Sequence, residues 1–146
     1  MRSVVTFKSD LFNLTEPKEH FMNPSCFGDD LAKWLIQRFK EKDIEVEEEP
    51  GQEDFGWYFH YLSEGTLHCL VIGNEGGEAW YLVVERHCGL LGSMFGQRHK
   101  KIVPAAIELV HTTLHEEPRI TDVEWFHWRQ FRRGQLTDGA SVPTVA

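Results

Sequence analysis

The chain has 146 residues, of which 41% are hydrophobic and 26% are charged, a mixture typical of one globular domain. Its formal net charge of −8 argues against the basic surface of a nucleic-acid-binding protein and favours a basic protein partner. No apolar run reaches the roughly 20 residues of a membrane span. We expect neither membrane insertion nor a secretory signal in the N-terminal segment.

The cysteines indicate a reducing compartment. Cys26, Cys69 and Cys88 form an odd set without a C-x-x-C pair, which favours free thiols over disulfides. We therefore expect a cytoplasmic protein. A periplasmic location is the alternative if a signal has been removed from the N-terminus.

The first third of the chain predicts a strand, a helix and a second strand. Residues 3–14 alternate weakly between apolar and polar side chains and predict the first strand. Residues 28–43 predict the helix, because large apolar residues recur there at i, i+3, i+4 and i+8. These residues are Leu31, Trp34, Leu35 and Phe39. Residues 44–47 alternate again and predict an edge strand, which an acidic turn at 47–54 follows.

Residues 52–73 predict a β-hairpin with aromatic strands. We expect a three-residue loop at 63–65 with Gly65 in the left-handed conformation. In that register one face is buried and carries Trp57, Phe59, Tyr61, Leu67, Cys69 and Val71. The other face, which would form a partner or dimer surface if left open, carries Tyr58, His60, Leu62, His68, Leu70 and Ile72. A two-residue loop is the alternative, and it would shift the pairing by one residue and mix the two sets.

The remaining elements complete the predicted fold. Residues 79–86 are apolar on both faces. We therefore expect this strand to be covered on both sides within the chain, or on one side by a second copy of the chain in a homodimer. A second helix begins near Val103, because Pro104 fits only a first helical turn, and a last strand lies within 119–128. The order predicts an α+β domain over 1–136, with a mostly antiparallel sheet of four to six strands and two helices packed on one face. Residues 137–146 predict a flexible tail.

Histidine pairs are the candidate metal ligands. His111 and His115 stand at i, i+4 on the second predicted helix, and His60 and His68 are cross-strand neighbours in the expected hairpin register. Each pair supplies two ligands, whereas zinc needs three or four protein ligands. We therefore expect structural histidines, with no metal and no cofactor.

Two further motifs are weak candidates for chemistry. Cys88 follows His87, but neighbouring side chains on a strand point to opposite faces, so the pair is not arranged for nucleophilic catalysis. The glycine-containing segment 89–101 precedes a helix start, where backbone N–H groups favour anions, and it offers Ser93 and Arg98. We predict no catalytic residue.

An acidic segment is the candidate partner-binding site. Catalytic carboxylate pairs need fixed positions in a cleft, whereas a dense run of carboxylates is typical of a solvated face. As a recognition surface for a basic protein, the segment offers Glu45, Glu47, Glu48, Glu49, Glu53 and Asp54. The alternative is a small enzyme or small-ligand-binding protein that uses the open sheet face or the glycine-containing loop. Its candidate residues are Tyr58, His60, His68, Ser93 and Arg98.

Three segments together resemble a group of small bacterial proteins of unassigned function. They are GDDLAKWLIQRFKEKDIEVEEEPGQEDFGWYF, AWYLVVERHCGLLGSMFG and ITDVEWF, and the resemblance covers about residues 28–126. It implies a capped Gly-Asp helix, a Phe-Gly-Trp strand and a Trp-containing strand that ends in Glu-Arg before a Gly-Leu-Leu loop. It transfers no catalytic residue. Size, charge and architecture add an analogy with the immunity proteins of toxin systems.

Overall fold

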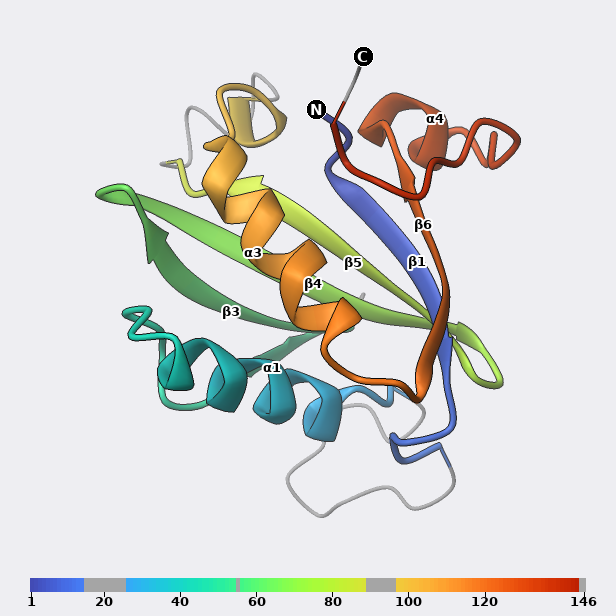
Figure 1. The fold of residues 1–146 in the computed structure, drawn as a ribbon, viewed down its shortest axis with the longest axis horizontal. Helices are drawn as coiled ribbons and strands as arrows, with labels where there is room; N and C mark the ends of the chain where they lie inside the picture. Colours follow the sequence, from blue (N-terminus) through green and yellow to red (C-terminus); the bar gives the residue numbers. More distant parts are fainter. Residues whose placement is uncertain (15–25, 55, 89–96, 145–146) are drawn as a thin grey trace.

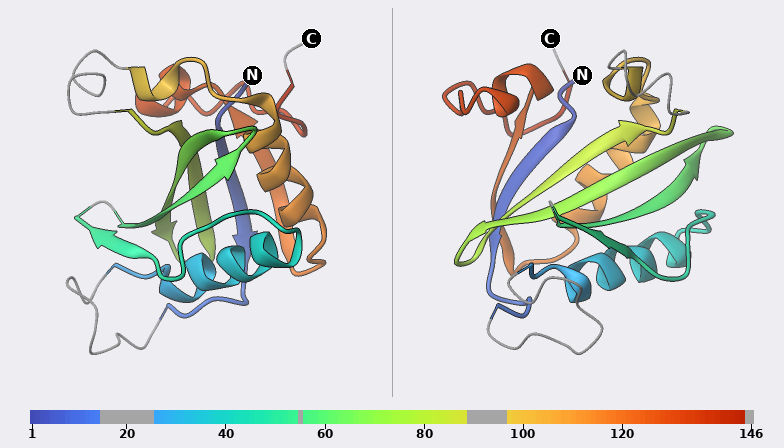
Figure 2. Two further views of the ribbon diagram at one scale, coloured as in Figure 1. Left: turned by 90° about the vertical axis from the view of Figure 1, so that its left-hand side faces the viewer. Right: turned by 180° about the vertical axis from the view of Figure 1, so that it is seen from behind.

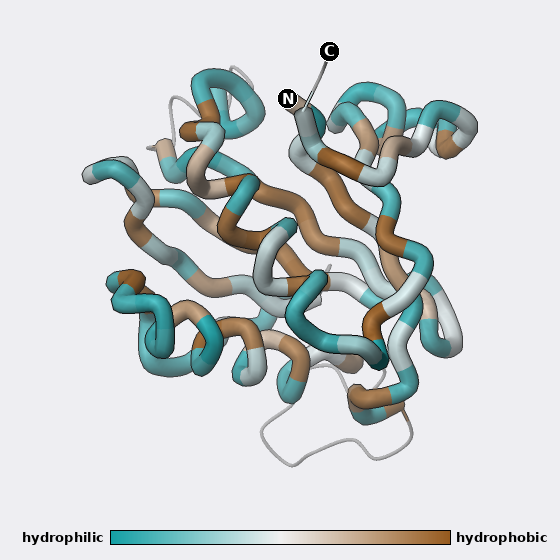
Figure 3. The backbone as a smooth tube through the Cα atoms, in the orientation of Figure 1, coloured by the Kyte–Doolittle hydropathy of each residue, from teal (hydrophilic) through white to brown (hydrophobic). Residues whose placement is uncertain are grey.

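The computed structural model describes residues 1–14, 26–54, 56–88 and 97–144. Six strands in these residues form one antiparallel sheet in the order β2-β3-β4-β5-β1-β6 (Figure 1). The strands are β1 Val4–Ser9, β2 Gly51–Glu53, β3 Gly56–Ser63, β4 Thr66–Gly76, β5 Ala79–Arg86 and β6 Ile120–Phe126. Apolar residues concentrate along the central strands (Figure 3). No helix among the described residues is long and apolar enough to cross a membrane.

Two helices, α1 (Asp29–Glu41) and α3 (Pro104–His115), pack on the same face of the sheet (Figures 1 and 2). Leu35 and Phe39 of α1 share one buried cluster with Ile107 and Val110 of α3 and with the helix-facing side chains of the strands. The hydroxyl of Tyr61 donates a hydrogen bond of 2.9 Å to the carbonyl oxygen of Ala106, which ties α3 to β3. The predicted α+β architecture is therefore confirmed.

The hairpin register differs by one residue from the expected one. Ser63 pairs with Thr66, so the loop contains only Glu64 and Gly65, whose φ angles of 49° and 74° are those of a type I′ turn. Trp57, Phe59 and Tyr61 therefore share the helix-facing side with three residues of β4: His68, Leu70 and Ile72. The expectation that Leu67, Cys69 and Val71 join them is wrong. Leu67 is exposed, and Cys69 and Val71 are only partly buried.

The predicted edge strand at 44–47 also differs from the structure. Residues 44–47 contribute one isolated bridge, from Val46 to Tyr61, and the edge strand β2 lies further along, inside the expected acidic turn. Within 137–144, the described part of the predicted tail, the backbone contacts the sheet. Ala140 and Trp125 exchange two backbone hydrogen bonds, of 2.7 and 3.0 Å, and the N–H of Arg2 donates to Pro143.

Among the described residues, the face of the sheet opposite α1 and α3 is covered only in part. A short helix, α4 (Trp128–Arg132), follows β6 and lies over this face. Trp128 and Phe131 pack against a second cluster around Val4, Val83 and Phe126. The outer surfaces of β3 and β4 lie beyond this cover (Figure 2, right). The outward-facing side chains of β3 and β4 beside this cover, such as Tyr58, His60, Cys69 and Val71, are therefore partly buried.

Candidate functional site

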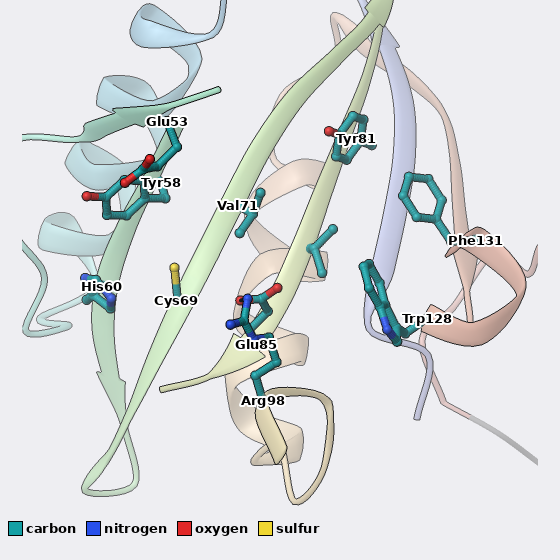
Figure 4. A pocket seen from close by; sticks show the side chains of 11 residues that line it. Glu53, Tyr58, His60, Cys69, Val71, Tyr81, Glu85, Arg98, Trp128 and Phe131 are labelled. Atoms are coloured by element: carbon teal, nitrogen blue, oxygen red, sulfur yellow. Dashed lines mark ion pairs between the residues drawn. The ribbon is translucent and has the colours of Figure 1, made fainter. Parts of the chain in front are cut away.

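A groove of about 540 Å³ lies on this partly covered face (Figure 4). Its floor is formed by Cys69, Val71 and Val83 from β4 and β5. Tyr58 and His60 stand on one side, and the rings of Trp128 and Phe131 from α4 stand on the other. Its volume is in the range of small-molecule sites, and its apolar centre with charged edges is also typical of protein interfaces.

Two tyrosines of the groove occupy space that glycines leave on the neighbouring strands. Tyr58 pairs with Gly51, and a Cβ atom on Gly51 would lie 2.5 Å from the Tyr58 ring. Tyr81 pairs with Gly73 in the same way, with a corresponding distance of 2.2 Å. A glycine opposite an aromatic residue lets the ring lie against the adjacent strand. The positions of the two rings therefore depend on glycine at 51 and 73.

A histidine on the β3 side is held by the acidic segment. Nδ1 of His60 lies 2.5 Å from Oε1 of Glu47, and the same oxygen accepts a 2.6 Å hydrogen bond from the His60 backbone N–H. The His60 ring also meets the ring of His87 edge-on, with centroids 5.1 Å apart. Glu47 therefore fixes the orientation of the imidazole at the groove.

A partly buried carboxylate marks one end of the groove. Glu85 has a side chain that is only 14% exposed, and its oxygens lie 3.9 Å from Arg98 Nη1 and 3.9 Å from His99 Nε2. Both distances exceed a direct charge-assisted hydrogen bond. Burial raises the pKa of Glu85, and Arg98 opposes that rise. His99 stacks on Trp128 with ring centroids 4.0 Å apart, and burial, assisted by Arg98 and Arg132, lowers the pKa of His99 to about 4.

A thiol lies between the histidine and the carboxylate. Cys69 pairs with His60 on one side and with Glu85 on the other, so the three residues form a row across the strands. Burial raises the pKa of the Cys69 thiol to about 12, and the charges of Glu85 and Glu47 add to the rise. A nucleophilic cysteine needs an environment that stabilises the thiolate. This arrangement favours the thiol over the thiolate instead.

The two histidine pairs considered as candidate metal ligands do not form metal sites. His60 and His68 lie on opposite faces of the hairpin, because His60 pairs with Cys69. His68 is fully buried; its Nδ1 donates to the Thr66 carbonyl at 3.0 Å and its Nε2 accepts from the Val103 N–H at 3.2 Å. Burial lowers the pKa of His68, so the ring is neutral. It is a structural residue that joins the hairpin to the start of α3.

The pair on α3 is also engaged within the protein. Nδ1 of His111 accepts a 3.1 Å hydrogen bond from the Trp125 indole, and Nδ1 of His115 donates to the His111 carbonyl at 2.8 Å. Burial, followed by the charge of His115, lowers the pKa of His111. Within the described residues, no group of three or more histidine, cysteine, aspartate or glutamate side chains is arranged to hold a metal ion.

The structure brings together part of the predicted site. Tyr58, His60 and Arg98 line the groove, whereas His68 lies in the core and Ser93 falls outside the described residues. All six carboxylates of the acidic segment are exposed, and Glu53 also lines the groove. Sequence reasoning missed the groove residues Glu85, Tyr81, Trp128 and Phe131. The glycines opposite tyrosines are the signal that could have located Tyr81.

No family model, curated protein or solved structure matches this chain. The site must therefore be interpreted from its own geometry and charge.

Proposed function

We propose that the protein is a non-enzymatic binding module that recognises a basic protein partner, in the manner of an immunity or inhibitor protein. The observation that carries this proposal is the continuity between the groove and the acidic segment. Glu53 belongs to both, and Glu47 reaches from the acidic segment to His60 in the groove wall. The partner would cover the groove with its apolar contacts and the acidic segment with its basic residues.

The charge distribution supports a basic partner. The acidic segment contributes six exposed carboxylates to the net charge of −8. Among the described residues, Glu47 pairs with His60 and Glu48 pairs with Lys40. Charges at the rim of an interface mainly accelerate association and select partners, whereas a desolvated apolar centre supplies most of the affinity. The two parts of the surface match these two roles.

Affinity purification from the source organism at low salt, with the wild-type protein and two charge-reversed variants, tests the proposal. The test variant carries Glu45→Lys, Glu49→Lys and Asp54→Lys. The control variant carries Glu64→Lys, Glu78→Lys and Glu124→Lys, which change the net charge equally at exposed positions outside the acidic segment. The recovered partner is identified, and its affinity for each protein is then measured at several salt concentrations.

We expect a partner with a basic surface, whose affinity for the wild type falls as salt increases. The test variant should bind at least about tenfold more weakly, mainly through a slower association rate, and the control should stay within about threefold of wild type. The proposal is wrong if wild type retains no partner at low salt, or if the control loses as much affinity as the test variant.

A second candidate function is the binding of a small ligand in the same groove. The volume of about 540 Å³ and the tyrosine rings that line the groove favour it. A thermal-shift screen of small organic molecules distinguishes the two functions. If the groove binds a small ligand, one of the compounds should raise the melting temperature of the protein. The same compound should have no effect on Val71→Trp, in which the larger side chain fills the groove.

A further inference from the structure

We infer that the groove holds a long basic side chain of the partner, a lysine or an arginine, with its aliphatic stem on the valine floor and its cationic head at Glu85. This inference rests on the proposed function, since it names the group that the partner inserts.

The floor and the sides of the groove suit an aliphatic stem. Val71 and Val83 lie next to each other across β4 and β5, and they present methyl groups toward the groove. The walls above them carry the rings of Tyr58 and Trp128, which lie on opposite sides (Figure 4). Lysine and arginine bury their methylene groups on such surfaces while the charged head stays at a polar edge. Aromatic walls add favourable cation–π contacts.

The charges of the groove favour a cation over an anion. The carboxylates of Glu53 and Glu85 both line the groove, and the guanidinium of Arg98 lines it as well. Glu85 is the more deeply placed carboxylate, and Nη1 of Arg98 lies 3.9 Å from its Oε2. A partly buried carboxylate whose counter-ion lies beyond direct hydrogen-bond distance gains from a cation that approaches more closely.

The cation nearest to Glu85 need not block this position. The Arg98 side chain is 42% exposed, so it can turn toward solvent when another cation approaches. His99 does not oppose the approach, because the ring is neutral at pH 7. Arg98 still repels an incoming cation while it stays beside Glu85. Removal of its charge should therefore strengthen binding of a basic group, whereas removal of the Glu85 charge should weaken it.

Two-dimensional NMR of the ¹⁵N-labelled full chain tests the inference. The probes are the N-acetyl methylamides of arginine, lysine, norleucine and glutamate, which share one backbone and differ at the end of the side chain. The proteins are wild type, Glu85→Gln, Arg98→Gln and the control Glu64→Gln, whose carboxylate lies in the exposed β3–β4 turn.

We expect the arginine and lysine probes to shift the amide signals of Cys69, Val71 and Val83 with dissociation constants of about a millimolar. Norleucine should bind more weakly and glutamate should not bind. Glu85→Gln should weaken the basic probes about fivefold or more, Arg98→Gln should strengthen them, and Glu64→Gln should change nothing.

The opposite signs of the two variants make the test decisive. Tighter binding of glutamate, with weakening by Arg98→Gln, would mean an anion site and would overturn the inference. Equal binding of norleucine and lysine would mean a purely apolar groove and would also overturn it, as would the absence of shifts with every probe. If the partner from the purification experiment binds Glu85→Gln as tightly as wild type, the inference fails while the proposed function stands.

Discussion

The ring of Tyr81 fills the space that a Cβ atom on Gly73 would need, since that atom would lie 2.2 Å from Cζ of the ring. The two residues are direct partners across β4 and β5, and the ring also lies 5.2 Å from that of Phe131 on α4. The absence of a side chain at Gly73 therefore sets the position of the Tyr81 ring, which lines the groove.

Gly73→Ala should displace the Tyr81 ring and destabilise the fold by about 1–3 kcal/mol, because Phe131 limits where the ring can move. Urea unfolding measures the loss. The double variant Gly73→Ala/Tyr81→Ala removes the clash, so its cost should be clearly smaller than the sum of the two single costs. Additive costs would show that the two residues do not compete for this space.

Trp57→Ala should cost about 3–5 kcal/mol, because Trp57 is 3% exposed and lies in the main core. It also removes the 2.9 Å hydrogen bond from the indole to the Cys26 carbonyl. His60→Ala should cost no more than about 1 kcal/mol, because it loses a partly exposed pair with Glu47 and edge-on ring contacts with Tyr58 and His87. Thermal denaturation compares the two variants. If Trp57→Ala melts like wild type but no longer binds the partner, this strand is a recognition surface instead of core.

Cys69 should react slowly with iodoacetamide at neutral pH, because its pKa is raised to about 12 by burial and by the charges of Glu85 and Glu47. Glu85→Gln removes one of these charges and should accelerate alkylation several-fold. Mass spectrometry of the peptide that contains Cys69 gives the rate. Glu64→Gln is the matched control and should leave the rate unchanged. Equal rates in all three proteins would contradict the electrostatic contribution of Glu85.

Stability should fall in mild acid partly because of His99. Folding lowers its pKa from about 6.5 to about 4, so the neutral ring contributes its full stabilisation above about pH 6.5 and loses it as the pH falls toward 4. The contribution is at most about 3 kcal/mol. His99→Gln should flatten the curve of unfolding free energy against pH in this window. Glu85 has a raised pKa, which acts in the opposite direction, and it is present in both proteins. An unchanged slope would contradict the prediction.

Glu64→Asn should stabilise the protein by about 0.5–1 kcal/mol. Glu64 has a φ of 49° at the first loop position of a type I′ turn, where asparagine is preferred before glycine. Glu64→Ala should have little effect, because alanine gains nothing in the left-handed region. Chemical denaturation distinguishes the two, and equal stability of the two variants would show that the turn conformation does not limit stability.

The sequence by itself determined the elements that depend on local periodicity. The apolar stripes of α1 and α3, the proline at the first turn of α3 and the alternation in β3 predicted an α+β sheet with two helices on one face. Apolar residues recur about every 3.6 residues on the buried face of a helix and every second residue on the buried face of a strand. These spacings identify the buried face because the opposite face stays in contact with water. Trp57, Phe59 and Tyr61 were correctly placed in the core for this reason.

Only the tertiary structure decided the register of the hairpin and the position of the groove. A one-residue change in loop length exchanges the two faces of β4, and Glu64 gave no local sign of the left-handed conformation that it adopts. His68 is buried because the N–H of Val103, 35 residues away, supplies its second hydrogen bond. The groove likewise depends on α4, whose five residues are too few for a periodic pattern to show and whose aromatic rings pack on a distant part of the sheet. Such contacts depend on residues brought together by folding, so local sequence patterns do not contain them.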